Sequence, residues 1–306
     1  MTNTMRDSYV LITAAKNEEA YIPRLLESVV SQTRLPETWV IVSDGSTDRT
    51  DELVVEFSRQ YDFIRLLKLA NQGQRVFSSQ AFASNLGYDS IKHSDFDFVG
   101  FLDADISFDA GYYKKLLSIF RANPQLGVAG GEIFERQGGG FQPRFGNSEE
   151  NVAGAIQLFR RRCFEDIGCR FIPLQHGGHD FVANAMARKE GWEVRSITGL
   201  PVYHHRPTGS VGTTQWRAWF RTGLQDYFMG YHALFEIGKC IRRVSSPPVG
   251  IGTVAQFCGY VFPWVTRRKR SVPDDFVQYL HQEQLRRVFP RAARPVEGNE
   301  RPRKSA

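Results

Sequence analysis

Disulfides, zinc sites and membrane spans find little support in this sequence. The four cysteines, Cys163, Cys169, Cys240 and Cys258, form no CxxC pair and no spacing that suits zinc, so we expect reduced, intracellular thiols. No apolar segment precedes a small-residue cleavage site near the N-terminus, which predicts a cytoplasmic protein without a secretory signal. The one uncharged stretch of suitable length, residues 244–266, contains three prolines and several glycines. We therefore expect no transmembrane helix.

Positive charge is concentrated late in the chain. The formal net charge is +6, and much of the excess lies in Arg242 and Arg243, in residues 267–270 and in a basic tail over 291–306, which we expect to be disordered. This distribution favours an anionic contact, for which a membrane surface or a phosphorylated substrate would fit. Solvated basic patches are an equal alternative. We expect no nucleic-acid partner.

Strand-like and helix-like segments alternate through the first half of the 306 residues, a length that suits one large α/β domain or two smaller ones. Short apolar runs at 9–15, 39–43, 63–69 and 96–106 are separated by segments with apolar residues at helical spacing. Such runs predict strands of a mostly parallel sheet with helices on both faces.

Polar turns follow three of the predicted strands, at residues 14–18, 43–48 and 103–105. Because ligands of open parallel sheets bind beyond the carboxyl ends of the strands, we expect these turns to surround one pocket. On an extended strand Asp103 and Asp105 would point to the same side. Two such carboxylates repel each other unless a cation lies beside them, so the pair predicts half of a Mg²⁺-type site that a diphosphate completes. A pair of exposed turn acids is the alternative, but the apolar run in front makes burial without a role costly.

Four stretches occur in the order and at roughly the spacing of a known family: VLITAAKNEEAYIPRLLESVVSQ, VIVSDGSTDRTDELV, GFLDADI and GGHDFVANAMARKEGWEV. Over about residues 8–210 the sequence resembles the family 2 glycosyltransferases with the GT-A fold. The resemblance implies an α/β fold with a mostly parallel central sheet and helices on both faces.

The resemblance also implies a domain organisation. A GT-A catalytic domain over 1–215 would consist of a Rossmann-like nucleotide-binding half, 1–107, and an acceptor-binding half, 108–215. A helical C-terminal region, 216–290, would follow.

Site residues are implied by the same resemblance. Asp44 would bind the nucleotide base, and Ala14 and Glu18 would line the base and ribose site. Asp103 would lie beside the ribose and the metal, and Asp105 would be the direct metal ligand. Arg75 is a further candidate for donor binding.

The resemblance assigns Asp180 as the base that deprotonates the acceptor hydroxyl. His179 stands where the family usually has glutamate, which leaves the electrostatic setting of Asp180 open. An N-cap role for Asp180 is the alternative. At least one of His204 and His205 would serve as a metal or phosphate ligand, without an indication of which, and Arg206 is a candidate diphosphate partner.

Together these residues predict a metal-dependent, inverting glycosyltransferase that uses Mn²⁺ or Mg²⁺. A divalent ion stabilises the leaving diphosphate, and one base without an enzyme nucleophile implies a single displacement. The donor would be a UDP, GDP or dTDP sugar, and the acceptor a saccharide or lipid-linked molecule in cell-surface polysaccharide or glycolipid synthesis. A nucleotidyltransferase that makes sugar nucleotides and a non-catalytic sugar-nucleotide-binding protein are the alternatives. The glycine-rich N-terminal signature of the first is absent, and Asp180 argues against the second.

The C-terminal region does not match processive relatives. Their QxxRW motif fails at QWRAW, where Ala218 occupies the position of the arginine. Residues 244–270, with Tyr260 and Trp264 near one end and arginines on both sides, suit a segment in the membrane interface. Packing of this segment on the catalytic core is the alternative, so a peripheral contact with the inner face of the cell membrane stays an expectation.

Overall fold

The computed structural model describes residues 7–69, 77–137, 139–144, 148–206, 215–244 and 250–289. The chain divides into two compact units, residues 1–214 and 215–306. Arg75 and the tail predicted to be disordered, 291–306, lie outside the described residues.

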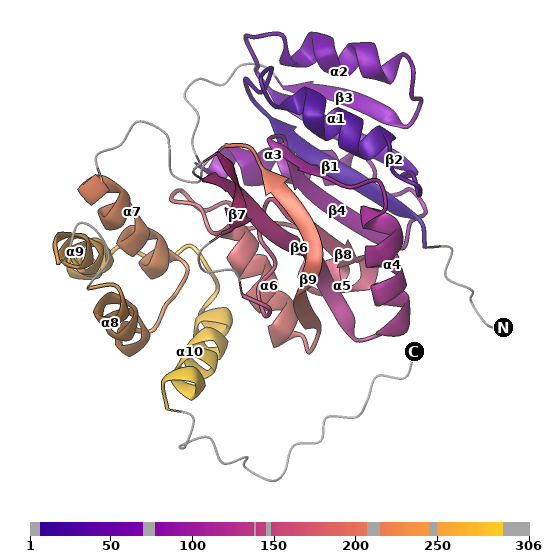
Figure 1. Cartoon of the computed structure of the whole chain (residues 1–306). Helices are drawn as coiled ribbons and strands as arrows, with labels where there is room; N and C mark the ends of the chain where they lie inside the picture. The colour runs from indigo at the N-terminus through magenta and orange to yellow at the C-terminus, as the bar shows by residue number, and fades with distance from the viewer. Residues whose placement is uncertain are drawn as a thin grey trace. The chain divides into compact units, whose positions relative to one another are not determined.

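A nine-stranded sheet forms the centre of the first unit (Figure 1). The strands follow the order β3-β2-β1-β4-β8-β6-β9-β5, and β7 pairs with β6. They are β1 (Tyr9–Ala15), β2 (Thr38–Asp44), β3 (Ile64–Leu69), β4 (Phe98–Asp103), β5 (Ile106–Phe108), β6 (Leu126–Gln137), β7 (Gly140–Pro143), β8 (Ile156–Arg160) and β9 (Glu193–His204). The first four strands in this order are parallel, and β8 runs antiparallel to both β4 and β6. The predicted fold class is therefore confirmed, with β8 as an antiparallel insertion.

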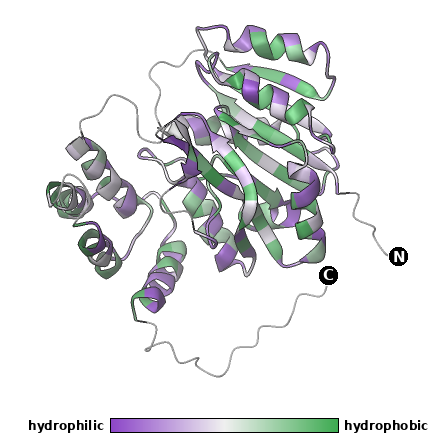
Figure 2. Ribbon diagram, viewed as in Figure 1, coloured by the Kyte–Doolittle hydropathy of each residue, from purple (hydrophilic) through white to green (hydrophobic). Residues whose placement is uncertain are grey.

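Helices cover both faces of this sheet. They are α1 (Ile22–Val30), α2 (Thr50–Ser58), α3 (Phe77–Asp89), α4 (Tyr112–Ala122), α5 (Arg161–Asp166) and α6 (His179–Lys189). Side chains of β1 alternate between two cores: Tyr9 and Leu11 pack with α1, α2 and α4, whereas Val10 and Ile12 belong to the core that includes α3, α5 and α6. This alternation follows from the two-residue period of a strand, and Figure 2 shows the hydrophobic residues concentrated along the strands.

The end of β4 differs from the prediction. The strand stops at Asp103, Ala104 and Asp105 form a turn, and β5 begins at Ile106. The two aspartates are therefore not neighbours on one face of an extended strand. The turn, and not the strand period, brings Asp105 to the side of the sheet on which Asp103 lies.

The described part of the second unit consists of four helices: α7 (Gln215–Phe228), α8 (Ala233–Arg242), α9 (Ile251–Val265) and α10 (Asp274–Val288). Two glycines allow α7 and α9 to approach closely, because a Cβ at Gly223 would lie 1.9 Å from the carbonyl oxygen of Gln256, and one at Gly259 would lie 2.0 Å from that of Phe220. Within the described ranges, no helix combines the length and apolar character that a membrane crossing needs.

Candidate active site

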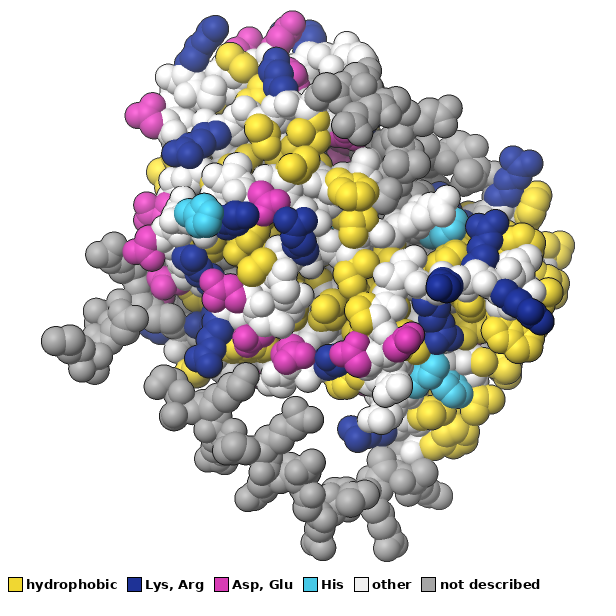
Figure 3. Space-filling model, turned by 180° about the vertical axis from the view of Figure 1, so that it is seen from behind, with side chains coloured by type: hydrophobic (Ala, Val, Ile, Leu, Met, Phe, Trp, Pro, Cys, Tyr) yellow, Lys and Arg dark blue, Asp and Glu magenta, His cyan; other side chains and the backbone are white. Residues whose placement is uncertain are grey.

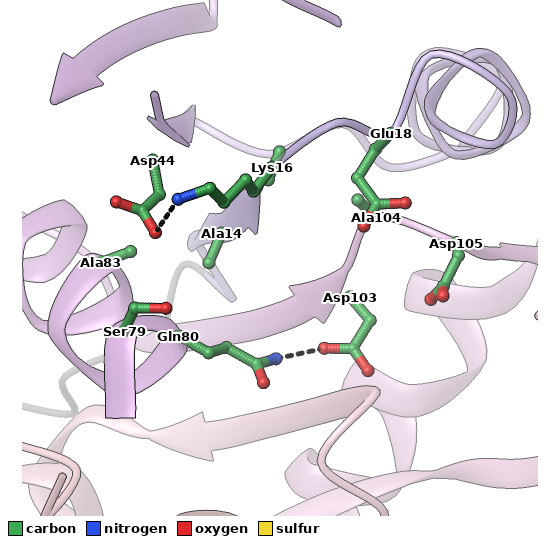
Figure 4. Close-up of a pocket in the computed structure, with 11 residues that line it drawn as sticks. Ala14, Lys16, Glu18, Asp44, Ser79, Gln80, Ala83, Asp103, Ala104 and Asp105 are labelled. Atoms are coloured by element: carbon green, nitrogen blue, oxygen red, sulfur yellow. Dashed lines mark hydrogen bonds and ion pairs between the residues drawn. The ribbon is translucent and has the colours of Figure 1, made fainter. Parts of the chain in front are cut away.

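The carboxyl ends of β1, β2 and β4 meet at one cleft of the first unit (Figure 4). Ala14 of β1 lies beside Asp103 of β4 and Val42 of β2 in the strand register, so these strand ends are level. The lining residues are Ala14, Ala15, Lys16, Glu18, Asp44, Ser79, Gln80, Ala83, Asp103, Ala104 and Asp105. The structure thus brings together Ala14, Glu18, Asp44, Asp103 and Asp105 at the edge of the sheet where ligands of open α/β folds bind.

Two loops that form one wall of the cleft are joined by hydrogen bonds. Asn17, with a φ of 56°, donates its backbone N–H to Ser46 Oγ and accepts from the backbone N–H of Thr47 at its Oδ1. The backbone N–H of Glu18 donates to Thr50 Oγ1 at the start of α2. These bonds hold the turn after β1 against the turn after β2, and so fix Glu18 relative to Asp44.

Asp44 has a cationic neighbour inside the cleft. Lys16 Nζ lies 3.5 Å from Asp44 Oδ2, and both side chains are largely buried. The pair offers both a hydrogen-bond acceptor and a donor where β1 and β2 end. The sequence interpretation included Asp44 but missed Lys16, although it lies within the same polar turn as Ala14 and Glu18.

Asp103, Asp105 and His204 form a cluster at the other end of the cleft. Each side chain offers one ligand atom, and the three atoms lie within 4.8 Å of one another. His204 Nε2 lies 3.2 Å from Asp105 Oδ1. Antiparallel pairing of β5 with β9 places Ile106 opposite His204, which brings the histidine to the turn. Carboxylate oxygens with one imidazole form a donor set that fits Mn²⁺ or Mg²⁺.

The repulsion expected between the two aspartates is relieved by cations of the chain itself. Arg206 Nε lies 3.4 Å from Asp105 Oδ2, and the same guanidinium forms an ion pair with Glu18 and stacks on the ring of Tyr21. Burial raises the pKa of Asp105, but the hydrogen bond from His204 and the charges of His204 and Arg206 outweigh it, so this pKa is lowered overall.

Asp103 is in the opposite electrostatic situation. Burial first, and the charge of Asp105 second, raise its pKa to about 7. The amide of Gln80 on α3 donates to Asp103 Oδ1 over 2.6 Å (Figure 4). Asp180 contributes a further negative charge that raises the same pKa. Residues 154 and 155 link Asp103 to Asp180, because the backbone N–H of Asp103 donates to the carbonyl oxygen of Ala155 and that of Gly154 donates to Asp180. Asp103 and Asp105 are thus electrostatically distinct before any ligand binds.

The structure distinguishes His204 from His205, of which the sequence did not indicate the ligand. His204 faces Asp105, and its Nδ1 lies 3.7 Å from Glu135 on β6. Burial lowers the pKa of His204, but the hydrogen bond and charge of Asp105 outweigh it and raise this pKa. His205 Nε2 instead lies 2.8 Å from Ser107 Oγ, with its ring against Phe141. His204 is therefore the histidine of the cluster, and His205 is not part of it.

Asp180 lies in the first turn of α6, after Gly178, whose φ of 94° is a glycine conformation. It is not the N-cap. Its Oδ2 accepts from the backbone N–H of Gly154 over 3.1 Å, and the described residues offer no hydrogen bond to its Oδ1. A Cβ at position 154 would lie 2.6 Å from Oδ2, so only glycine allows this approach. His179, the departure from the family pattern, is turned to Phe171, and burial lowers the pKa of its imidazole.

The sheet with an acidic cleft at its carboxyl edge has the GT-A fold that the sequence resemblance implies. Residues 10–184 match the sequence model of the family described as glycosyl transferase family 2. This match covers more than half of the chain, which therefore belongs to that family.

Curated relatives agree with this assignment to the family. The chain is 30% identical to the poly-beta-1,6-N-acetyl-D-glucosamine synthase of Staphylococcus epidermidis over 158 residues, 51% of this chain and 32% of the relative. The Staphylococcus aureus (strain COL) synthase is 30% identical over 165 residues, 53% of this chain and 34% of the relative. The chain thus spans about a third of the length of these relatives.

Two similar structures share the fold at low identity. Residues 1–349 of TarS from S. aureus, solved with UDP-GlcNAc, give a TM-score of 0.54 at 16% identity over 90% of this chain and 82% of that one. The mannosyltransferase PcManGT from Pyrobaculum calidifontis, solved with GDP-Man and Mn²⁺, gives a TM-score of 0.54 at 16% identity, over 95% of this chain and 77% of that chain.

Proposed function

We propose that the chain transfers a hexose from a nucleotide-diphosphate sugar to an acceptor hydroxyl, in a single displacement that inverts the anomeric carbon. The cluster of Asp103, Asp105 and His204 carries this proposal, because it offers a cation site that residues 154 and 155 connect to Asp180, the proposed base. The nucleotide sugars in the two similar structures support a UDP or GDP donor, and dTDP stays open. Residues 1–107 would bind the donor and residues 108–215 the acceptor.

Different residues of the cleft would bind different parts of the donor and the cation. Asp44, with Ala14 and Lys16, would contact the base and ribose, and Arg206 would exchange a carboxylate partner for the donor diphosphate. Asp103, Asp105 and His204 would hold Mn²⁺ or Mg²⁺, which supplies a Lewis acid for the leaving diphosphate.

Asp180 would remove the acceptor proton. The Gly154 N–H holds one of its oxygens, which leaves Oδ1 for the acceptor hydroxyl. A positioned carboxylate base contributes roughly 10²- to 10⁴-fold to rate. With Asp180 as the base and the acidic residues of the cleft assigned to the donor and the cation, the transfer would be a single displacement that inverts the anomeric carbon.

The decisive measurement is nucleoside diphosphate release from UDP, GDP and dTDP sugars with Mn²⁺ or Mg²⁺. We expect Asp180→Asn to lower turnover by about 10²- to 10⁴-fold with donor affinity within a few-fold of wild type. Asp105→Asn should abolish turnover and also weaken metal-dependent donor binding. Asp62→Asn changes an exposed carboxyl outside the cleft and serves as the matched control.

Three outcomes would contradict the proposal. Near-normal turnover of Asp180→Asn would remove the base assignment. Pyrophosphate release in place of nucleoside diphosphate would favour a nucleotidyltransferase. Donor binding without turnover would favour a sugar-nucleotide-binding protein.

We also propose a peripheral contact of residues 244–270 with an anionic membrane surface, which would place the chain at the inner face of the cell membrane and suit a saccharide or lipid-linked acceptor. Four apolar side chains of α9 are between 62% and 70% exposed: Ile251, Val254, Trp264 and Val265. A basic run, 267–270, follows directly. Figure 3 shows hydrophobic and basic side chains close together on the surface of this unit. Apolar and basic side chains together match the two attractions of a membrane interface.

One aromatic residue of this segment does not support the contact. Tyr260 is buried and donates its hydroxyl hydrogen to the carbonyl oxygen of Tyr231. It therefore packs within the helical unit, and only Trp264 of the two predicted anchors is exposed.

A further inference from the structure

A second cavity of the first unit lies next to Asp180. Its lining includes Ile133 of β6, Arg144 after β7, Ser148, Phe181 of α6 and Ser196 of β9, besides Asp180 itself. None of these neighbours of Asp180 lines the donor cleft. Asp180 is thus placed between the cleft, whose Asp103 senses its charge, and this cavity.

Most polar groups in the cavity already have partners within the chain. Asn184 donates to the carbonyl oxygen of Val152 over 2.7 Å and accepts from Gln157 over 3.0 Å. Ser148 Oγ accepts from the backbone N–H of Glu150. These bonds shape the cavity wall and leave these side chains little capacity to select a ligand.

Arg144 is different, because its guanidinium has no ion pair with any described residue. The side chain is partly buried at the cavity, and only its backbone N–H is committed, to the carbonyl oxygen of Ile133. A guanidinium that is partly removed from water without a counter-ion is unfavourable. Its planar fork of donors matches a carboxylate or phosphate in a bidentate manner.

We propose that this cavity binds the acceptor and that Arg144 selects an acceptor with an anionic substituent, a carboxylate or a phosphate, on the sugar unit that presents its hydroxyl to Asp180. The proposal rests on the proposed glycosyl transfer and adds the substrate class of its acceptor side. Ile133 and Phe181 provide apolar surface for the C–H groups of a sugar ring, and Arg144 provides the one cationic side chain among the described residues that line the cavity.

Matched acceptor pairs test the proposal. We would measure nucleoside diphosphate release above acceptor-free hydrolysis with glucose, glucuronate and glucose 6-phosphate, and with the galactose series. Wild type should prefer an anionic member of a pair by kcat/KM. Arg144→Gln should reduce that preference by about 10- to 100-fold, the range expected for hydrogen bonds to a charged group. Arg162→Gln, on an exposed arginine of α5 that does not line the cavity, should preserve it. The carboxylate and phosphate arms then identify which anion is recognised.

Binding measurements separate this proposal from the proposed function. Calorimetric titration of inorganic phosphate and of glucuronate requires no turnover, and Arg144→Gln should weaken binding of one of them at least tenfold relative to Arg162→Gln. Equal use of neutral and anionic acceptors by wild type, or an Arg144→Gln variant with unchanged preference and unchanged anion binding, would overturn the proposal while glycosyl transfer stands. Absence of nucleoside diphosphate release with every donor would instead reject the proposed function, and the anion titration would still decide the role of Arg144.

Discussion

At the scale of single residues, the geometry of the proposed base depends on a glycine. Gly154 donates its backbone N–H to Asp180, and an added Cβ would lie 2.6 to 2.9 Å from three atoms of the aspartate side chain. Because Asp180 Cβ is one of these atoms and is fixed to the backbone of α6, rotation of the side chain alone does not relieve the contact. A methyl group at 154 therefore requires a shift of the first turn of α6 or of the 154 backbone, and this shift displaces the proposed base.

We therefore predict that Gly154→Ala lowers kcat by about 10- to 100-fold, because a displacement of about 1 Å in a catalytic group can cost 10² in rate. KM for the donor should stay close to wild type, and the melting temperature should fall only modestly, because the required shift is confined to the first turn of α6 and the 154 backbone. Gly111→Ala is the matched control, since its added Cβ would have only Lys115 nearby, at 3.8 Å. A large fall in melting temperature with proportional loss of donor binding would show that Gly154 supports the fold and not the base.

Residues that the sequence did not identify have a common physical reason for being missed. Glu135 lies opposite His204 only through the register of β6 and β9, and Gln80 reaches Asp103 from α3. Neither belongs to a local motif. The requirement for glycine at position 154 becomes apparent only in the structure, where Asp180 lies directly against it. By contrast, Asp44 and Asp103 were predictable because each ends a strand whose apolar run is recognisable in the sequence.

At the scale of elements, the alternation of strands and helices up to β4 followed from the sequence because β1, β2 and β4 are short, buried apolar runs. The second half was less predictable. β8 is a five-residue buried strand that pairs antiparallel with strands 58 and 29 residues away, as in the pairs Leu158–Gly100 and Leu158–Ala129, and no local pattern sets such a direction. The choice between His204 and His205 was equally a matter of strand register.

Three helices of the second unit bury a group of acids that the proposed function does not use. Glu236 of α8 is fully buried and accepts from Gln256 of α9 over 2.8 Å, and Asp226 of α7 forms an ion pair with Lys239 over 2.5 Å. Burial first, and the charge of Asp226 second, raise the pKa of Glu236 from 4.5 to about 7. The group thus connects three helices through one titratable carboxyl.

This raised pKa predicts a pH-dependent stability. The folded state keeps the Glu236 proton up to about pH 7, whereas the unfolded state loses it near the ordinary pKa of glutamate. The contribution of Glu236 to the free energy of unfolding is therefore full at low pH and is lost as pH rises through 7. Between about pH 5 and about pH 8, wild type should lose about 1 to 3 kcal/mol of unfolding free energy relative to Glu236→Gln. Denaturant unfolding at both pH values measures this difference.

The amide in Glu236→Gln can donate to Asp226 and carries no charge, which makes it a conservative replacement. Glu56→Gln, on an exposed glutamate of α2, is the control and should follow the wild-type pH profile. Parallel profiles for wild type and Glu236→Gln would contradict the raised pKa.

At the scale of the whole molecule, the proposed membrane contact combines net charge with exposed apolar surface. We predict that the protein floats with vesicles containing anionic lipid and not with neutral vesicles. Binding should weaken as salt rises from about 0.05 to about 0.5 M, because each basic residue near an anionic surface contributes about 1 kcal/mol that salt screens.

Substitutions at α9 separate the contribution of exposed apolar surface from that of positive charge. The double change Trp264→Glu with Val265→Glu should abolish flotation, since both side chains are at least 65% exposed. Leu35→Glu replaces an exposed apolar residue of the first unit and should leave flotation unchanged. Flotation that persists after the double change, or that is equal on neutral vesicles, would reject the contact.

The long strand β9 has a further consequence. Residues 194–197 pair with 128–131 of β6 and residues 201–204 pair with 132–135, whereas Thr198, Gly199 and Leu200 are skipped in the register. The first segment carries Ser196 of the proposed acceptor cavity, and the second ends at His204. The bulge gives the two segments separate registers on β6. Ser196 and His204 are therefore positioned by the same strand but not by one continuous ladder of hydrogen bonds.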